Sequence, residues 1–166
     1  MTTSKPDKVE EIRKAAERLD AEARSTDELM LGITQLLNER MLKYNWVGFY
    51  MLEPGADPPM LLLGHYKGAM TPHTRIPLNQ GICGAAASTG KTVVVDDVTK
   101  DSRYLACSLE TKSEIVVPVF KHGVVAGELD IDSHFPAAFG LEDRELIEYC
   151  AGLVGKSLEG KQGKTS

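Results

Sequence analysis

A cysteine in a polar loop is the strongest candidate for chemistry in this sequence of 166 residues. Cys107 lies in the polar stretch 104–114, directly before a strongly apolar segment. Loops that a rigid sheet positions often carry reactive groups, and a thiolate is a strong nucleophile. Most free cysteines, by contrast, are buried and inert. The sequence leaves both interpretations of Cys107 open, a nucleophile or a packed thiol.

Two further cysteines lie in different settings. Cys83 follows Gly81 at a predicted helix start, where backbone N–H groups and the helix dipole favour a thiolate that could resolve an oxidised partner. The alternative is that a close-packed turn simply requires a small residue there. Cys150 lies on an amphipathic helix, where core packing explains it better. The odd number of cysteines argues against a disulfide scaffold, and without Cys-x-x-Cys spacing or clustered histidines we expect no metal.

Two carboxylates lie two residues apart in a predicted strand. Asp130 and Asp132 alternate with Leu129 and Ile131, so both point to one face of a sheet. Aspartate is depleted from strands and costly to bury unless it is paired or hydrogen-bonded, which suggests a functional role. A half-exposed strand would show the same alternation, so solvated surface residues are the alternative.

Glu114 is a third candidate carboxylate, on the other strand of the same predicted hairpin. A strict two-residue turn at His122-Gly123 places Glu114 and Asp130 on opposite faces of the sheet. A three-residue turn, or a bulge near Pro118 or Gly127, would return all three carboxylates to one face.

Two aromatic residues flank a glycine on one strand face. Trp46 and Tyr50 lie on either side of Gly48, and the gap between the rings could hold a small aliphatic ligand. Aromatic residues at this spacing also occur as plain core.

The elements that must position these residues follow from the periodicity of the sequence. A charged amphipathic helix is predicted over 6–23, and a second begins at the Ser25–Glu28 capping box and runs to about Lys43. Strands, a short helix ended by Gly90, a hairpin across His122-Gly123 and a closing helix follow, over 46–51, 60–66, 81–90, 92–95, 113–120, 124–132 and 141–158. This order does not alternate as a parallel sheet would, and it predicts an antiparallel sheet covered by helices.

Composition limits the classes of partner. The chain is long enough for one buried core, and its net charge of -5 gives no general attraction to nucleic acid. No stretch is apolar enough for a membrane span and the first ten residues are polar, so we expect a cytoplasmic protein. The apolar stripe of the first helix is thin, and docking against a partner subunit would use it, which suggests a homodimer.

Several motifs occur together in a fixed order. They are Asn45-Trp46-Val47-Gly48-Phe49-Tyr50, Gly81-Ile82-Cys83-Gly84, Val95-Asp96-Asp97-Val98, Tyr104-Leu105-Ala106-Cys107, Ser113-Glu114-Ile115-Val116-Val117-Pro118 and Leu129-Asp130-Ile131-Asp132-Ser133. From about residue 27 to residue 150 the sequence thereby resembles the free methionine-(R)-sulfoxide reductase family. The resemblance implies an α+β GAF fold over 25–160, in which N- and C-terminal helices pack on a six-stranded antiparallel sheet. A charged helix over 1–24 would precede it, and a disordered polar tail over 161–166 would follow.

The resemblance also implies roles for the candidate residues. The cysteine matching Cys107 attacks the sulfoxide sulfur and becomes a sulfenic acid. The carboxylates matching Glu114, Asp130 and Asp132 hold the substrate, and the aromatic residues matching Trp46 and Tyr50 shape the pocket. A second thiol then forms a disulfide, which a thioredoxin-like reductant reduces without any bound cofactor.

One position departs from the family pattern. His73 stands where the family usually carries its resolving cysteine, so Cys83 or an external thiol would have to resolve the intermediate. Two other functions remain open. The chain could be a non-catalytic GAF module that binds a small metabolite as a sensor, or a redox switch in which Cys83 and Cys107 pair without substrate.

Overall fold

The computed structural model describes residues 7–104 and 109–164. A six-stranded sheet forms its centre, with antiparallel neighbours in the order β3-β2-β1-β6-β5-β4. The strands are β1 Trp46–Leu52, β2 Met60–Lys67, β3 Arg75–Pro77, β4 Val93–Val95, β5 Ser113–Lys121 and β6 Val124–Ser133. The helices are α1 Lys8–Glu22, α2 Thr26–Arg40, α3 Gly81–Thr89 and α4 Leu141–Lys164, with a short 3-10 turn at Val98–Lys100. The expected α+β architecture is confirmed.

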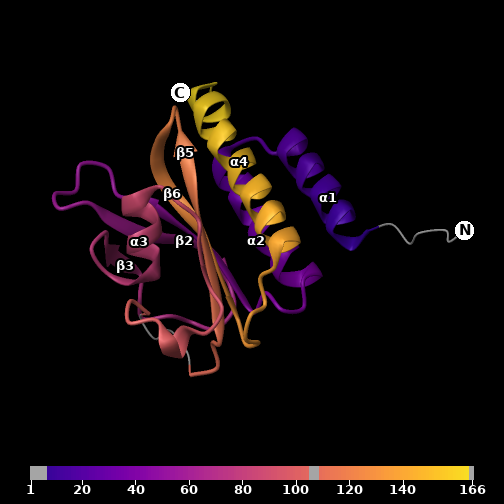
Figure 1. Cartoon of the computed structure of the whole chain (residues 1–166). Helices are drawn as coiled ribbons and strands as arrows, with labels where there is room; N and C mark the ends of the chain where they lie inside the picture. Colours follow the sequence, from indigo (N-terminus) through magenta and orange to yellow (C-terminus); the bar gives the residue numbers. More distant parts are fainter. Residues whose placement is uncertain (1–6, 105–108, 165–166) are drawn as a thin grey trace, which may run out of the picture.

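The sheet has a different cover on each of its two faces. Helices α1, α2 and α4 lie together on one side, and α3 with the loops around it lies on the other (Figure 1). Alternate strand residues point to the helical side and join its apolar core. They include Val47, Phe49, Ile115, Val117, Leu129 and Ile131, all at most 3% exposed. Each such side chain contributes roughly 1.5–3 kcal/mol when fully buried, so this core is a large source of stability.

The first two helices begin at side-chain caps. Asp7 accepts a hydrogen bond from the backbone N–H of Val9, and Ser25 accepts one from that of Glu28 at 3.1 Å. The Glu28 carboxylate in turn accepts from the N–H of Arg24, one residue before the cap. These bonds satisfy donors that a helix start leaves unpaired, as the capping box in the sequence predicted.

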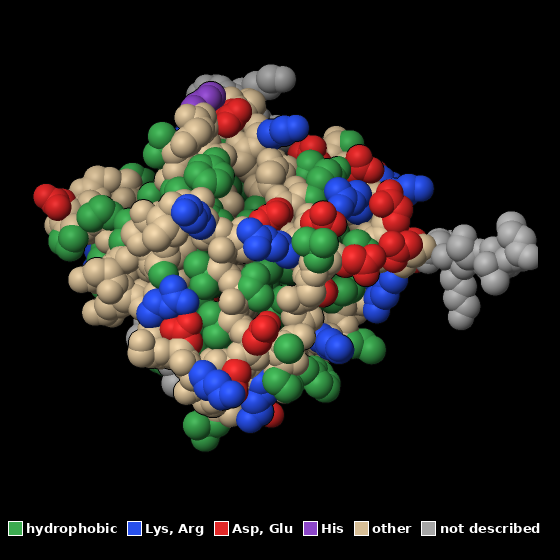
Figure 2. All heavy atoms as spheres, in the orientation of Figure 1, with side chains coloured by type: hydrophobic (Ala, Val, Ile, Leu, Met, Phe, Trp, Pro, Cys, Tyr) green, Lys and Arg blue, Asp and Glu red, His purple; other side chains and the backbone are tan. Residues whose placement is uncertain are grey.

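Helix α1 uses its apolar stripe within its own chain. Ile12 and Ala16 are fully buried, and α1 packs against both α2 and α4. The suggestion that this stripe docks against a partner subunit is therefore wrong, because these side chains already have partners. Figure 2 shows acidic and basic side chains intermixed over the outer surfaces of α1 and α4.

The hairpin of β5 and β6 contains the bulge that the sequence left open. Its two-residue turn, His122-Gly123, has positive φ at both residues, as a tight hairpin turn requires. Beyond the turn Phe120 pairs with Val125 but Val119 pairs with Gly127, which leaves Ala126 as the extra residue. The bulge shifts the register by one, so every later residue of β6 points to the opposite face from the one that a strict hairpin gives.

A glycine beside the bulge is required by close packing. A Cβ atom on Gly127 would lie 2.5 Å from the backbone oxygen of Tyr50 in the neighbouring strand. Next to the bulge, therefore, β1 packs so closely against β6 that only a residue without a side chain fits at position 127.

Among the described residues, no helix combines the length and apolar character that a membrane crossing requires.

Candidate active site

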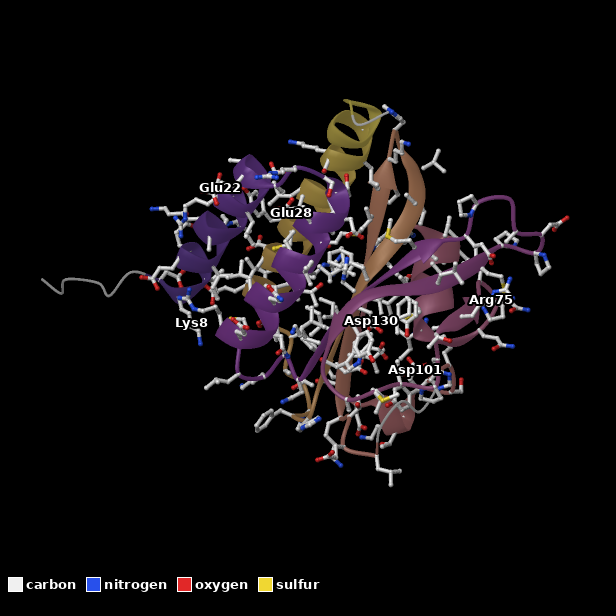
Figure 3. The ribbon with its side chains drawn as sticks, turned by 180° about the vertical axis from the view of Figure 1, so that it is seen from behind. Lys8, Glu22, Glu28, Arg75, Asp101 and Asp130 are labelled. Atoms are coloured by element: carbon white, nitrogen blue, oxygen red, sulfur yellow. The ribbon has the colours of Figure 1, made fainter. Side chains whose placement is uncertain are left out.

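A row of three carboxylates lines one face of β6. Glu128, Asp130 and Asp132 alternate along the strand and point away from the core helices, toward α3. Their exposed fractions are 0%, 3% and 3%. Figure 3 shows Asp130 near the middle of the molecule, far from the surface residues Lys8 and Glu22. The alternation is therefore not that of a solvated strand face.

The bulge brings a fourth carboxylate to this face. Glu114 of β5 pairs directly with Asp132, and paired residues of neighbouring strands point to the same side. Glu114 is 5% exposed. The structure therefore places Glu114, Asp130 and Asp132 together.

Glu128 is a site-face residue that the sequence reasoning missed. It is fully buried, and neither of its carboxylate oxygens has a hydrogen-bond partner among the described residues. The signal was available, because Glu128 precedes Asp130 by the same two residues that separate Asp130 from Asp132. Leu129 separates Glu128 from Asp130 just as Ile131 separates Asp130 from Asp132, so the row of carboxylates on this face includes Glu128 as well.

Burial determines the protonation of these carboxyl groups. Desolvation raises the pKa of Glu128 and of Asp132 well above their ordinary values. The Cys83 thiol partly opposes this rise for Glu128 and Glu114 partly opposes it for Asp132, while the charge of Asp130 adds to both. Desolvation also raises the pKa of Asp130, against the opposing effect of hydrogen bonds with Glu114 and Cys83. The cluster therefore retains protons at pH values where an exposed carboxylate has lost its own.

Cys83 faces the same cluster from α3. Its thiol is 6% exposed and donates a hydrogen bond to Asp130 Oδ2, with sulfur and oxygen 3.4 Å apart. Burial raises the pKa of Cys83 well above 9.0, and the charges of Asp130, Glu128 and Glu114 raise it further. The sequence-based expectation of a thiolate at this helix start is therefore wrong, since desolvation and three carboxylates outweigh the helix dipole.

The aromatic residues of β1 lie over the same face. Trp46 pairs with Asp132, Gly48 with Asp130 and Tyr50 with Glu128. The Trp46 indole stacks on Tyr50 and on Tyr66, with ring centroids 6.2 Å and 5.5 Å apart.

The gap expected above Gly48 is filled by the indole itself. A Cβ atom on Gly48 would lie 2.5 Å from the Trp46 ring. The indole N–H of Trp46 donates to the backbone oxygen of Ala69, and the hydroxyl of Tyr50 donates to that of His73. Both rings are therefore anchored to the loop 69–73, and this loop forms the rim of the site.

Two small cavities open on this face. One, of about 20 Å³, is lined by Tyr50, His73, Ile76, Gly81, Ile82, Cys83, Glu114 and Asp130. The other, of about 80 Å³, is lined by Asn45, Trp46, Ala69, Met70, Thr71, Glu110, Thr111, Asp132 and His134. The smaller has room for about one water-sized group. His73 and Cys83 line the same cavity. His73, which stands where the family usually carries its resolving cysteine, therefore lies close to Cys83, the cysteine suggested to take over that role.

Of the other two cysteines, only Cys150 lies within the described residues, and it lies apart from this cluster. Cys107 lies outside the described residues; Glu110 and Thr111, shortly after it in the chain, line the larger of the two cavities. Cys150 is fully buried in the core of α4, and burial raises its pKa to about 12. Cys150 is therefore a packing residue, as the sequence indicated.

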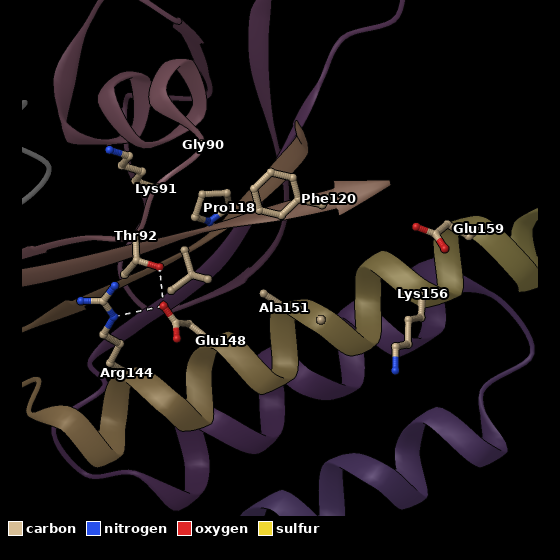
Figure 4. Close-up of a pocket in the computed structure, with 12 residues that line it drawn as sticks. Gly90, Lys91, Thr92, Pro118, Phe120, Arg144, Glu148, Ala151, Lys156 and Glu159 are labelled. Carbon is tan, nitrogen blue, oxygen red and sulfur yellow. Dashed lines mark hydrogen bonds and ion pairs between the residues drawn. The ribbon is translucent and has the colours of Figure 1, made fainter. Parts of the chain in front are cut away.

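A larger groove of about 590 Å³ lies between β5 and α4 (Figure 4). Glu148 accepts hydrogen bonds there from Thr92 at 2.7 Å and from Arg144 at 3.0 Å. Its described lining residues include no cysteine, so the groove does not offer the thiol chemistry that the opposite face does.

Comparisons with known proteins agree with this geometry. The GAF domain family model matches residues 25–158. The chain is 36% identical over 123 residues to free methionine-R-sulfoxide reductase of Escherichia coli, a match that covers 74% of this chain and 72% of that protein. The reductase of the same name from Saccharomyces cerevisiae is 40% identical over 114 residues, or 68% of this chain, and the match spans only 62% of the yeast protein.

A solved structure resembles the whole fold. It is that of free methionine-R-sulfoxide reductase from Neisseria meningitidis in complex with its substrate. The TM-score is 0.88 at 32% sequence identity, and the match covers 99% of this chain and 98% of that one.

Proposed function

The chain belongs to the GAF domain family, and we propose that it reduces free L-methionine-(R)-sulfoxide to methionine with thiols as reductant. The proposal starts from its relatives, which include free methionine-R-sulfoxide reductases. One observation carries the proposal. Four buried carboxyl groups, two aromatic rings and a thiol share one face of the sheet, and this arrangement has no structural purpose that a hydrophobic face would not serve better.

The carboxyl groups suit both ends of the substrate. A free amino acid carries an ammonium group, which an ionised carboxylate such as Glu114 can bind. The sulfoxide oxygen must be protonated or strongly hydrogen-bonded before the sulfur becomes a good electrophile. A carboxyl group whose pKa is raised by burial, as that of Glu128, Asp130 or Asp132 is, can supply such a proton at pH values where an exposed carboxyl group has already lost its own. The Trp46 and Tyr50 rings provide apolar surface for the methyl group of the substrate.

Cys107 is the proposed nucleophile. Its sulfur attacks the sulfur of the protonated sulfoxide, the sulfoxide oxygen ends on Cys107 as a sulfenic acid, and methionine leaves as the reduced product. The sulfenic acid then condenses with a second thiol to a disulfide and water. Two electrons from an external dithiol, such as a thioredoxin-like protein, return the disulfide to thiols.

Cys83 is the proposed second thiol, in competition with an external one. It is buried and carries its proton, so resolution through Cys83 requires Asp130 or Glu128 to accept that proton. Turnover of Cys83→Ser should be compared with thioredoxin and with dithiothreitol. A loss confined to thioredoxin supports a resolving role for Cys83, and an equal loss with both reductants would rule out a purely resolving role.

Purified protein with free methionine sulfoxide and dithiothreitol tests the activity directly. The proposal predicts catalytic release of methionine. Tight binding without turnover would contradict it and favour the second candidate, a GAF sensor module. The presence of His73 at the usual position of the resolving cysteine is the observation that favours that second candidate.

The remaining expectations are parts of this proposal. A cytoplasmic location would supply thioredoxin-like reductants, and the homodimer would form through a surface other than the buried stripe of α1. Light scattering of the purified chain measures the oligomeric state.

A further inference from the structure

We propose that the cavity between α3 and β6 binds a thiophilic divalent cation such as Zn²⁺ through Cys83, Glu114 and Asp130. The sulfur of Cys83 and one carboxylate oxygen from each of the two acids all lie within 4.8 Å of one another. Each residue comes from a different element, α3, β5 and β6, so the sheet and the packed helix hold the three in place. All three are at least nine-tenths buried.

The distances suit a tetrahedral ion. Zinc lies about 2.3 Å from a thiolate sulfur and about 2.0–2.2 Å from a carboxylate oxygen, which places two such ligands roughly 3.5 Å apart. Cys83 Sγ and Asp130 Oδ2 are 3.4 Å apart without any movement. The cavity that these residues line has a volume of about 20 Å³, which is room for one ion.

Unsatisfied oxygens give a separate reason for a cation here. Asp130 Oδ1 and Asp132 Oδ1 are buried and have no hydrogen-bond partner among the described residues, and the same holds for both oxygens of Glu128. Buried carboxylates of this kind are normally paired or bound to a metal. A dication would coordinate such oxygens, and on binding it would displace the proton of the Cys83 thiol and any proton that Glu114 or Asp130 retains, all of which pass to solvent.

The cation would use groups that the substrate needs. Under the proposed function, Glu114 and Asp130 hold free methionine sulfoxide, so we expect Zn²⁺ to inhibit the reaction by competing with substrate. This expectation rests on the proposed function. Cation binding itself does not depend on it. A protein that binds the metal but reduces no sulfoxide would leave this inference standing and remove the proposed function.

Cadmium is a suitable probe because its bond to a thiolate gives an ultraviolet charge-transfer band. The reduced, metal-free full chain should bind one Cd²⁺ with this band, and Zn²⁺ should displace it. Cys83→Ser should lose the band, and its affinity should fall at least about tenfold. Asp130→Asn keeps the thiol but should also lose at least about tenfold in affinity.

The buried Cys150 provides a control. Cys150→Ser should bind Cd²⁺ as the unmodified chain does, with thermal unfolding used to show that every variant is folded. Absence of the band from the unmodified chain would overturn the inference. So would its persistence in Cys83→Ser, its loss in Cys150→Ser or undiminished affinity in Asp130→Asn.

Discussion

The buried carboxyl groups of β6 reduce the stability of the fold in a pH-dependent way. Glu128 makes no hydrogen bond to the described residues, and desolvation raises its pKa well above 4.5. The folded state therefore binds this proton more tightly than the unfolded chain does. Stability from this group is fully present below about pH 4.5 and is lost as the pH rises toward the raised pKa.

Glu128→Gln should remove this loss. The amide has nearly the same shape and no charge, so the variant should gain stability relative to the unmodified chain as the pH rises from 5 to 8. The gain is at most about 1.4 kcal/mol per pH unit. Urea unfolding at several pH values measures the free energy of unfolding of the variant and of the unmodified chain. The substitution of an exposed residue, Glu39→Gln, is the control, and its effect on this free energy should not show the same increase with pH. A stability difference for Glu128→Gln that is constant from pH 5 to pH 8 would contradict the assignment.

The contact between Gly48 and Trp46 can be tested by fluorescence. Trp46 is the single tryptophan of the sequence, so the emission of the protein reports on this ring alone. Gly48→Ala places a methyl group against the indole and also 2.9 Å from Cβ of Tyr66, so the ring must move. We expect a changed emission spectrum and at least about tenfold weaker binding of methionine sulfoxide.

Gly64→Ala is the matched control for Gly48→Ala. Gly64 lies on neighbouring β2, where an added Cβ atom would come no closer than 3.4 Å to another atom, the backbone oxygen of Phe49. Its emission and affinity should stay close to those of the unmodified chain. Unchanged emission in Gly48→Ala would show that the indole does not lie over this glycine.

Helix α4 carries two glycines that should respond oppositely to the same substitution. A Cβ atom on Gly152 meets nothing within 4 Å, whereas one on Gly155 meets the backbone oxygen of Phe120 on β5. Gly152→Ala should therefore stabilise the chain by about 0.5–1 kcal/mol, through helix propensity alone. Gly155→Ala should destabilise it by roughly 1–3 kcal/mol, since α4 must move away from the sheet. Chemical unfolding compares the two, and equal effects would contradict the close approach of α4 to β5.

The elements of the fold could be predicted because their signals are local. Period-two alternation, the Ser25 cap and Gly90 at the end of α3 each depend on residues within a few positions. The bulge at Ala126 could be named only as one of several possibilities, because a register shift depends on the backbone contact between Gly127 and Tyr50, which is not local in the sequence.

Errors in the site prediction have the same origin. The pKa of Cys83 was misjudged in direction because the helix start is visible in the sequence, whereas the carboxylates of two distant strands around the thiol are not. The apolar stripe of α1 looked unpartnered because α4, its neighbour in the fold, lies more than a hundred residues later. Glu128, by contrast, could be predicted by extending the alternation of Asp130 and Asp132 two residues toward the N-terminus.

The whole molecule separates stability from chemistry across one sheet. The face covered by α1, α2 and α4 holds the larger apolar core, and the face covered by α3 holds a smaller apolar cluster together with the buried acids, which oppose folding. These acids persist because the core on the other face offsets their cost. Substitutions on the chemical face that remove charge should therefore raise stability while they lower activity.

A single-turnover experiment tests the central proposal most directly. Reduced protein, freed of all external thiol, is mixed with an excess of either diastereomer of free methionine sulfoxide, and the methionine formed is counted. The R form should give about one methionine per chain with the loss of protein thiols, the S form should give none, and Cys107→Ser should give none with either. Methionine release from Cys107→Ser, or none from the unmodified chain with the R form, would contradict reduction by Cys107.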